Sequence, residues 1–324
     1  MLRFVLWRML SMVTVMFAIS VLVFLIFFAT PGVDPAARIA GRNADQQTLR
    51  AVRHDFGLDQ PLPVQYVLLM KKLFITRDLE SYVNRGAKVI PQVEEAAPVT
   101  LSLVIGASLI WVATSVLMGV LAAVFRGSII DSGLMIIGLI GISMPVFWLG
   151  EVVNLITQSR LHDEFFSWLP PLGYTPLTED PEQWFLHLLF PWITLSVLYI
   201  GFYGRVLRSS LIDSQSEDFV RTARSKGLTE RRVLGRHILR TSMITFVSLF
   251  GLDFAALVAG GALLTEVVFG LPGVGKLTYD SLENLDLPII MATTMYASFF
   301  IVMANAVVDI LYGFLDPRTR EARN

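Results

Sequence analysis

Six long apolar segments limit this chain to one kind of architecture. The first covers residues 9–29 and contains no charged side chain over 21 residues. Such a run is long enough to cross a hydrocarbon core of about 30 Å as a helix. The others cover residues 99–125, 133–157, 188–204, 241–265 and 287–308. With 54% hydrophobic and 16% charged residues the chain is too apolar for a soluble globular protein, so we predict an all-α membrane protein with six transmembrane helices.

The first apolar segment has two interpretations. Arg3 and Arg8 precede it, as basic residues precede both a membrane helix and a cleaved secretory signal. The apolar core of a signal peptide is usually only about 7 to 15 residues long, and a small-residue cleavage site follows it. Here the run is longer, rich in Phe, and ends at Pro31-Gly32, which favours an uncleaved first helix.

Charge and turn residues divide the chain into three parts. Residues 1–29 form a short N-terminal segment and the first helix. Residues 30–98 carry charges every few positions and several Pro and Gly residues, which indicates an extracytoplasmic loop or small domain. Residues 99–324 contain the five remaining spans of a membrane core. Within this core, residues 205–240 form one long polar loop between the fourth and fifth spans.

The distribution of Lys and Arg predicts the orientation of the chain. Six spans place both termini on one side of the membrane. With the N-terminus in the cytoplasm, the inner segments hold fifteen Lys and Arg residues, and the short outer loops hold two, Arg160 and Lys276. Cytoplasmic loops carry an excess of such residues, whereas loops longer than about 60 residues cross regardless of charge. We therefore expect both termini and the loop 205–240 in the cytoplasm.

The polar loop contains a short predicted helix. Glu217 and Asp218 lie at its N-terminal end and Arg224 and Lys226 at its C-terminal end, as the helix dipole favours, and Gly227 is placed to end it. One face of this helix, at spacings of three and four residues, consists of Phe219, Thr222, Ala223 and Lys226. A small, partly apolar face in water suits docking into the groove of a partner. An amphipathic helix that lies on anionic lipid is the alternative.

Two acids interrupt the apolar segments. Glu151 lies in the third span and Asp253 in the fifth. A carboxylate within a membrane costs a few kcal/mol, and by default it faces a helix-bundle interior or a wet cavity. We interpret both as candidates for lining a translocation path; a helix–helix hydrogen bond or a protonated acid is the alternative. Asp309 lies near the cytoplasmic end of the last span, where we expect it to pair with Arg205 or Arg208.

Glycines recur within the spans at positions that suit close helix packing. Small residues let helix backbones approach one another where lipid offers no hydrophobic drive for association. The residues concerned are Gly133, Gly138, Gly141, Gly201, Gly204, Gly260, Gly261 and Ala262. Glycine is also simply common in membrane helices, which is the alternative at each site.

The sequence contains no complete enzyme motif. Residues 270–276 match a phosphate-binding loop as far as Lys276, but Leu277 stands where Ser or Thr would bind Mg²⁺. The chain has no Cys, and its four His residues lack metal-ligand spacing. We therefore predict a non-catalytic chain without a metal or cofactor of its own and without a role in binding nucleic acid.

Residues 219–228, FVRTARSKGL, resemble the cytoplasmic loop of a known family, the membrane-spanning permease subunits of bacterial ABC importers, in the dipeptide, oligopeptide and nickel branch. Further islands of resemblance follow in the same order along the chain. They are Pro31-Gly32, Asp34-Pro35, Phe56-Gly57-Leu58-Asp59, Ser143, Pro145, Phe147-Trp148-Leu149-Gly150, Glu266, Pro272-Gly273-Val274-Gly275, Asp309 and Leu315-Asp316-Pro317-Arg318. The turn at residues 270–276 belongs to these islands, which explains the false phosphate loop.

The resemblance implies a role for the whole chain in the inner membrane. It implies binding-protein-dependent import of peptides by a heterodimer with a second, homologous permease, together with two cytoplasmic ATPase subunits or one fused ATPase, an external substrate-binding protein and the surrounding lipid. ATP and Mg²⁺ would be bound by the ATPases. The residues that would couple to the ATPase are Glu217, Asp218, Phe219, Val220, Arg221, Thr222, Ala223, Arg224, Ser225, Lys226, Gly227 and Leu228.

Two alternatives remain open at this point. Within the same branch, the substrate could be a nickel chelate, glutathione or a sugar instead of a peptide. A secondary transporter would need no ATPase and often contains inverted repeats with helices broken near mid-membrane. We find no repeat in the sequence and expect no broken helix.

Overall fold

The computed structural model describes residues 2–28, 36, 46–55, 57–84, 86–159 and 161–315, and most of these are helical. Five helices are long and apolar enough to cross a membrane: Trp7–Ile26, Val89–Val124, Pro181–Ser214, Glu230–Gly261 and Leu287–Val307. A sixth span is formed if the pair Ile129–Ser143 and Val146–Thr157 crosses as one bent element. The predicted all-α membrane fold is therefore confirmed.

The chain divides into two compact units. The first comprises Met1–Pro98, Val258–Leu263 and Gly273–Asn324, and the second comprises Val99–Leu257 and Leu264–Pro272. The helices of the first unit are α1 (Leu2–Phe28), α3 (Gln46–Asp55), α4 (Leu62–Met70), η1 (Lys71–Ile75), α13 (Val274–Asn284) and α14 (Leu287–Leu315), with the start of α5 (Val89–Val124).

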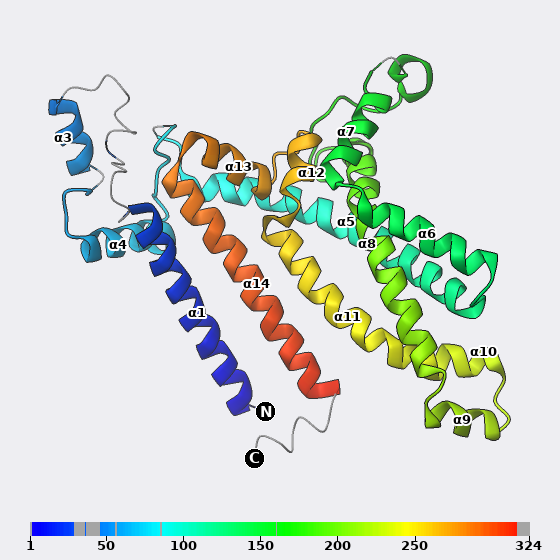
Figure 1. Ribbon diagram of the computed structural model, residues 1–324. Coiled ribbons are helices and arrows are strands. Elements are labelled where there is room, and N and C mark those ends of the chain that lie inside the picture. Colours follow the sequence, from blue (N-terminus) through cyan, green and yellow to red (C-terminus); the bar gives the residue numbers. More distant parts are fainter. Residues whose placement is uncertain are drawn as a thin grey trace. The chain divides into compact units, whose positions relative to one another are not determined.

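In the first unit, α1 lies along α14, and α13 packs on α14 (Figure 1). Their core contains Phe24, Leu73, Val89 and Met291, all nearly inaccessible to solvent. The loop before α5 is fixed to the start of α14 by Asp286, which accepts hydrogen bonds from the Ser81 hydroxyl and the Tyr82 backbone N–H. Burial, together with the nearby Asp286 carboxylate, raises the pKa of Tyr82.

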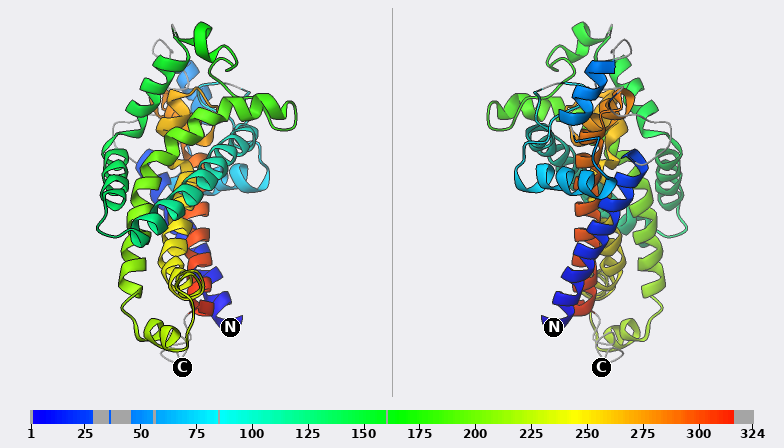
Figure 2. Two further views of the ribbon diagram at one scale, coloured as in Figure 1. Left: turned by 90° about the vertical axis from the view of Figure 1, so that its right-hand side faces the viewer. Right: turned by 90° about the vertical axis from the view of Figure 1, so that its left-hand side faces the viewer.

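The second unit is built around α8 (Pro181–Ser214), which packs against its neighbours α6, α7 and α11. Its helices are the rest of α5, α6 (Ile129–Ser143), α7 (Val146–Thr157), η2 (His162–Phe166), α8, α9 (Asp218–Ser225), α10 (Glu230–Val233), η3 (Leu234–Ile238), α11 (Leu239–Ala256) and most of α12 (Leu263–Val268). Along the chain, η4 (Leu257–Gly261) connects α11 to α12, and all of it but Leu257 belongs to the first unit. Figures 1 and 2 show α9 and α10 at the end of α8 opposite η2.

Glycine packing between α6 and α8 confirms part of the prediction. A Cβ atom built on Gly201 would lie 2.2 Å from the carbonyl oxygen of Gly138, so neither position has room for a side chain. Gly141 similarly meets the backbone of Val197. Gly133 was wrongly included, because nothing lies within 4 Å of its Cβ position. Close approach of helices in lipid thus depends on particular glycines and not on their number.

The third predicted span is not one helix, which corrects the expectation of unbroken helices. α6 ends at Ser143 and α7 begins at Val146, and the two axes meet at 94°. Met144 has ψ 125° because the ring of Pro145 disfavours helical geometry in the residue before it. Pro145 then serves as the N-cap of α7.

The fifth predicted span is also interrupted. The helix that begins with α11 ends within η4, where Gly260 has φ 105°, a backbone conformation open to glycine and strained for other residues. α12 follows as a separate short helix. In contrast, α8 extends beyond the predicted residues 188–204 at both ends, because charged residues such as Arg205 end an apolar run without ending a helix.

Candidate functional site

The polar loop contains the predicted short helix, α9, with Glu217 as its N-cap. Gly227 follows the C-cap residue Lys226 and has φ 75°. The Gly227 N–H donates to Arg224 O at 2.9 Å, and the Leu228 N–H donates to Ala223 O at 3.4 Å. These two bonds form a Schellman motif, in which a left-handed residue satisfies the last carbonyls of a helix. The predicted helix and its stop at Gly227 are confirmed.

The buried face of α9 differs from the predicted docking face. Val220 and Ala223 are buried, as is Val233 on α10, against which α9 packs. Ala223 therefore faces its own chain and is not part of an exposed surface. Phe219 is 38% exposed. The exposed side chains of α9 that remain for a partner are Asp218, Phe219, Arg221, Thr222, Arg224 and Ser225, followed by Lys226.

An ion pair ties the two short helices together. The Arg224 guanidinium donates to both carboxylate oxygens of Glu230, at 2.8 and 3.2 Å. The Glu230 carboxylate raises the pKa of Arg224. Both side chains are exposed, so water and salt screen the pair, and it fixes orientation more than it adds stability.

Asp253 lies on α11, more than two turns from the end of the helical stretch 230–261. Its Oδ2 accepts a hydrogen bond of 2.6 Å from the hydroxyl of Tyr203 on α8. Tyr203 is fully buried. Aromatic rings surround this contact: Phe246 packs edge-on against Tyr203, and Trp111 stacks on Tyr199 with ring centroids 4.6 Å apart.

Glu151 lies at a different level of the second unit. It is exposed on α7, next to Gly150, whose Cβ position faces Thr194 of α8. Thr194 and Tyr203 are nine residues apart on α8, roughly 13 Å along the helix axis. The two predicted acids are therefore not brought together in one site.

Two other acids in apolar helices were not predicted as site residues, although Glu266 belongs to one of the segments that resemble the family. Glu266 on α12 is fully buried and accepts a 2.7 Å hydrogen bond from the Thr100 hydroxyl. Asp131 on α6 accepts two hydrogen bonds from Arg208, at 2.6 and 2.7 Å, and a third from the Gly127 N–H. The spacing of Ser128 and Asp131 is that of a capping box, which could have identified this helix start.

Arg208 has a partner that the sequence did not suggest. It binds Asp131, and the pair is largely buried. The expected pair of Asp309 with Arg205 or Arg208 stays a prediction, because the Asp309 side chain lies outside the described residues. The Arg208–Asp131 contact joins α6 to the part of α8 that leads to α9.

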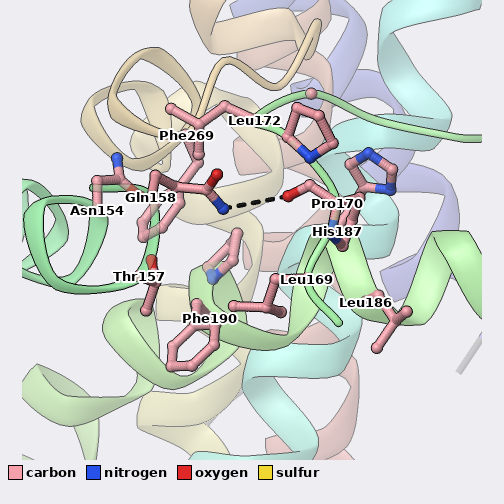
Figure 3. Close-up of a pocket in the computed structure, with 13 residues that line it drawn as sticks. Asn154, Thr157, Gln158, Leu169, Pro170, Leu172, Leu186, His187, Phe190 and Phe269 are labelled. Atoms are coloured by element: carbon pink, nitrogen blue, oxygen red, sulfur yellow. Dashed lines mark hydrogen bonds between the residues drawn. The ribbon is translucent and has the colours of Figure 1, made fainter. Parts of the chain in front are cut away.

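A small pocket, open to solvent, lies beside the N-terminal part of α8, at the end of the second unit opposite α9. Figure 3 shows the side chains that line it. Gln158 spans it by donating to Pro170 O at 3.1 Å, and His187 lies on its α8 side. Asn154 donates to Val268 O at 2.9 Å, while its Oδ1 is buried without a partner among the described residues. Within that part of the chain, no group of three His, Asp or Glu residues could hold a metal ion.

Two family models match nearly the whole chain. One, described as binding-protein-dependent transport system inner membrane component, matches residues 115–321. The other, described as the N-terminal part of such a membrane component, matches residues 1–104.

Individual relatives match over the same length. A probable peptide ABC transporter permease protein of Sinorhizobium fredii is 36% identical over 98% of this chain and 99% of its own. A putative peptide transport system permease protein of Brucella abortus is 35% identical over 98% of both chains. The glutathione transport system permease protein GsiC of Escherichia coli K12 is 37% identical over 99% of both.

Proposed function

Because this chain belongs to the family of binding-protein-dependent transport system inner membrane components, we propose that it is the permease subunit of an ATP-driven importer of di- or oligopeptides. Membership of the family makes the chain a multi-pass inner-membrane permease of an ABC transport system. Peptides are proposed because relatives that match almost end to end are named for peptide transport. The glutathione permease among the relatives makes glutathione, itself a tripeptide, the second candidate, ahead of nickel chelates or sugars.

The orientation that we propose rests on the Lys and Arg count. Both termini and the loop with α9 and α10 lie in the cytoplasm, and residues 30–98 lie outside. The pocket beside Gln158, at the other end of α8, then faces the outer side of the membrane. The chain works with a second permease, two ATPase subunits or one fused ATPase that bind ATP and Mg²⁺, and an external binding protein.

The observation that carries the coupling role is the placement of α9. It is a short helix closed by a Schellman motif and packed on α10, at the end of a 34-residue helix, α8. α8 is roughly 50 Å long, and the part from Pro191 to Ser214 contains no further proline, so movement of α9 by an ATPase is carried along α8 to the level of Pro191. The buried Arg208–Asp131 contact carries the same movement to α6.

A substitution at Gly227 tests this coupling role. Nothing lies within 4 Å of the Gly227 Cβ position, but the left-handed backbone there strains any other residue, Asp and Asn less than most. Gly227→Asn carries a similar backbone strain without the charge, so the difference between Gly227→Asp and Gly227→Asn reports the effect of the charge. We expect Gly227→Asp to weaken ATPase association and ATP-driven peptide uptake at least about tenfold, because the new charge faces the partner. Gly235→Asp is the matched control: it adds the same charge to an exposed glycine in the same loop, with open space around it and an ordinary backbone conformation.

The measurements are co-purification of the ATPase subunits and uptake of radiolabelled peptide into proteoliposomes that contain the complete complex. Uptake that requires ATP and resists a protonophore separates the importer from a secondary transporter. Normal association and uptake with Gly227→Asp would refute the docking role of α9.

We also propose that Asp253 and Glu151 line the translocation path. Each is a carboxylate within an apolar segment, and neither belongs to an ion pair within the described residues. They would act at different depths, given the separation of their contacts along α8.

A further inference from the structure

Asp253 is placed where it cannot face lipid. It lies within an apolar helix and is only half-buried by its own chain. A carboxylate in the hydrocarbon region faces protein or water, because contact with acyl chains costs several kcal/mol. The side of Asp253 that the second unit leaves uncovered therefore faces an aqueous path or another protein surface.

The carboxylate is oriented but not neutralised by its surroundings. Among the described residues, the one polar contact to the Asp253 side chain is the 2.6 Å bond from Tyr203 to Oδ2. Tyr203 itself is fixed, since it is fully buried and packs against Phe246. No Lys, Arg or His of the described part forms an ion pair with Asp253. One oxygen thus remains for a ligand, and its preferred ligand is a cation.

Aromatic rings line the same place. Tyr199 lies one turn from Tyr203, with ring centroids 6.3 Å apart, and remains half-buried. Phe250 lies on α11, one turn from Asp253, and contacts Trp111. The faces of aromatic rings attract ammonium groups, most strongly where water is scarce. A carboxylate beside Tyr and Phe rings is therefore a site for an organic ammonium group and rejects anions.

We propose that Asp253, positioned by Tyr203 and flanked by Tyr199, binds the terminal ammonium group of the substrate on the translocation path. The proposal deepens the proposed function and rests on it. Peptides and glutathione, the compounds for which the relatives are named, share a free amino group that is protonated at neutral pH. The site would select for that group whatever the side chains of the peptide are.

The first test uses thiol chemistry, which the absence of Cys in this chain makes clean. Ala256→Cys places a thiol on an exposed residue one turn from Asp253 on the same face of α11, in the complete complex. Its rates of reaction with a cationic trimethylammonium and an anionic sulfonate methanethiosulfonate are compared by the mass shift of this chain. Val247→Cys, exposed on another face of α11, is the control.

We expect the ratio of the cationic to the anionic reaction rate to be about tenfold higher for the thiol at position 256 than for that at position 247, because Asp253 attracts the cationic reagent. Asp253→Asn should abolish this excess. Tyr203→Phe, which keeps the ring and removes the donor, should reduce it by about threefold, and Asp253→Glu should restore most of it. The proposal is overturned if the ratio is unchanged in Asp253→Asn, or if the thiol reacts with neither reagent in any nucleotide state.

The second test compares uptake of trialanine with that of propanoyl-dialanine, which lacks the amino group. Both peptides are measured with the wild-type complex and with Asp253→Asn. For each complex, the uptake rate of trialanine is divided by that of propanoyl-dialanine. The same binding protein delivers both peptides to both complexes, so its own preference cancels when the wild-type ratio is divided by the ratio of the variant. We expect the wild type to favour trialanine by about tenfold more than the variant does.

The outcomes separate the two claims. If the wild-type complex shows no ATP-driven uptake of either peptide, the proposed function fails, while the thiol ratios still report on Asp253. Uptake with a preference that Asp253→Asn leaves unchanged would refute ammonium recognition alone.

Discussion

α8 holds two carboxylates of neighbouring helices, and the two contacts are used differently. Arg208 binds both oxygens of Asp131, and the Gly127 N–H adds a third bond. Five residues earlier, Tyr203 gives Asp253 a single bond and leaves it half-buried. A carboxylate whose acceptors are filled is a clamp between helices, whereas one that keeps an oxygen unused is available to a ligand. The two contacts differ in how many hydrogen bonds the carboxylate accepts, and not in the type of the acidic residue. We call the Asp131 contact saturated and the Asp253 contact unsaturated.

Loss of the Arg208–Asp131 contact should lower the melting temperature more than any other change considered below. Asp131→Asn leaves the partly buried Arg208 without its counter-charge, and we expect the melting temperature of the purified complex to fall by about 10 °C. The double variant Asp131→Leu with Arg208→Met should recover most of the loss, because no charge is then left unpaired. A loss below about 2 °C for Asp131→Asn would show that the clamp is not saturated in the membrane.

The second effect tests whether α6 and α8 are held together by close packing as well as by charge. Gly201→Ala adds a Cβ that overlaps the Gly138 backbone, and we expect the melting temperature to fall by about 5 °C. Ala is otherwise the better helix former, so the sign of the change is diagnostic. Gly133→Ala, in open space on α6, should leave the melting temperature unchanged or raise it slightly. An equal loss in both variants would contradict the packing argument.

The unsaturated contact should matter less for stability. Tyr203→Phe removes one hydrogen bond of about 1 kcal/mol and keeps the ring, so we expect the melting temperature to fall by only about 3 °C. Thermal unfolding followed by fluorescence would measure it beside Asp131→Asn. If Tyr203→Phe were as destabilising as Asp131→Asn, Asp253 would belong to the structural contacts and the comparison would fail.

Loss of the exposed Arg224–Glu230 pair should change the melting temperature least. Arg224 and Glu230 form the same two-bond geometry as Arg208 and Asp131, but in contact with solvent. We expect Arg224→Gln to lower the melting temperature by less than about 2 °C at low salt and to have no effect at about 1 M salt. A larger, salt-independent loss would mean that geometry, and not burial, decides the strength of these pairs.

Sequence reasoning predicted what depends on local composition. Apolar runs gave the membrane helices, and the step from Lys226 to Gly227 gave the end of α9, because one residue with positive φ is enough to stop a helix. The bend after Ser143 was missed although Pro145 is visible in the sequence. One proline hardly changes the mean hydropathy of a long apolar segment, but it disfavours helical geometry in the residue before it.

Contacts between distant segments could not be predicted. Asp131 and Asp309 are both acids near the ends of apolar runs, so the sequence alone does not indicate that Arg208 binds Asp131. Similarly, the spacing on α9 permits more than one face, and only the packing of α10 places Ala223 inside. Gly133 and Gly201 are equally plausible contact residues until the neighbouring helix is known.

The right-angle elbow between α6 and α7 limits which neighbours this chain can have. The last carbonyl groups of α6 and the first N–H groups of α7 have no partner within their own helices. Acyl chains cannot supply hydrogen bonds, so these groups must meet protein, headgroups or water. Acyl chains are therefore excluded from the elbow at residues 140–149, which other parts of the protein, a neighbouring subunit, headgroups or water must cover.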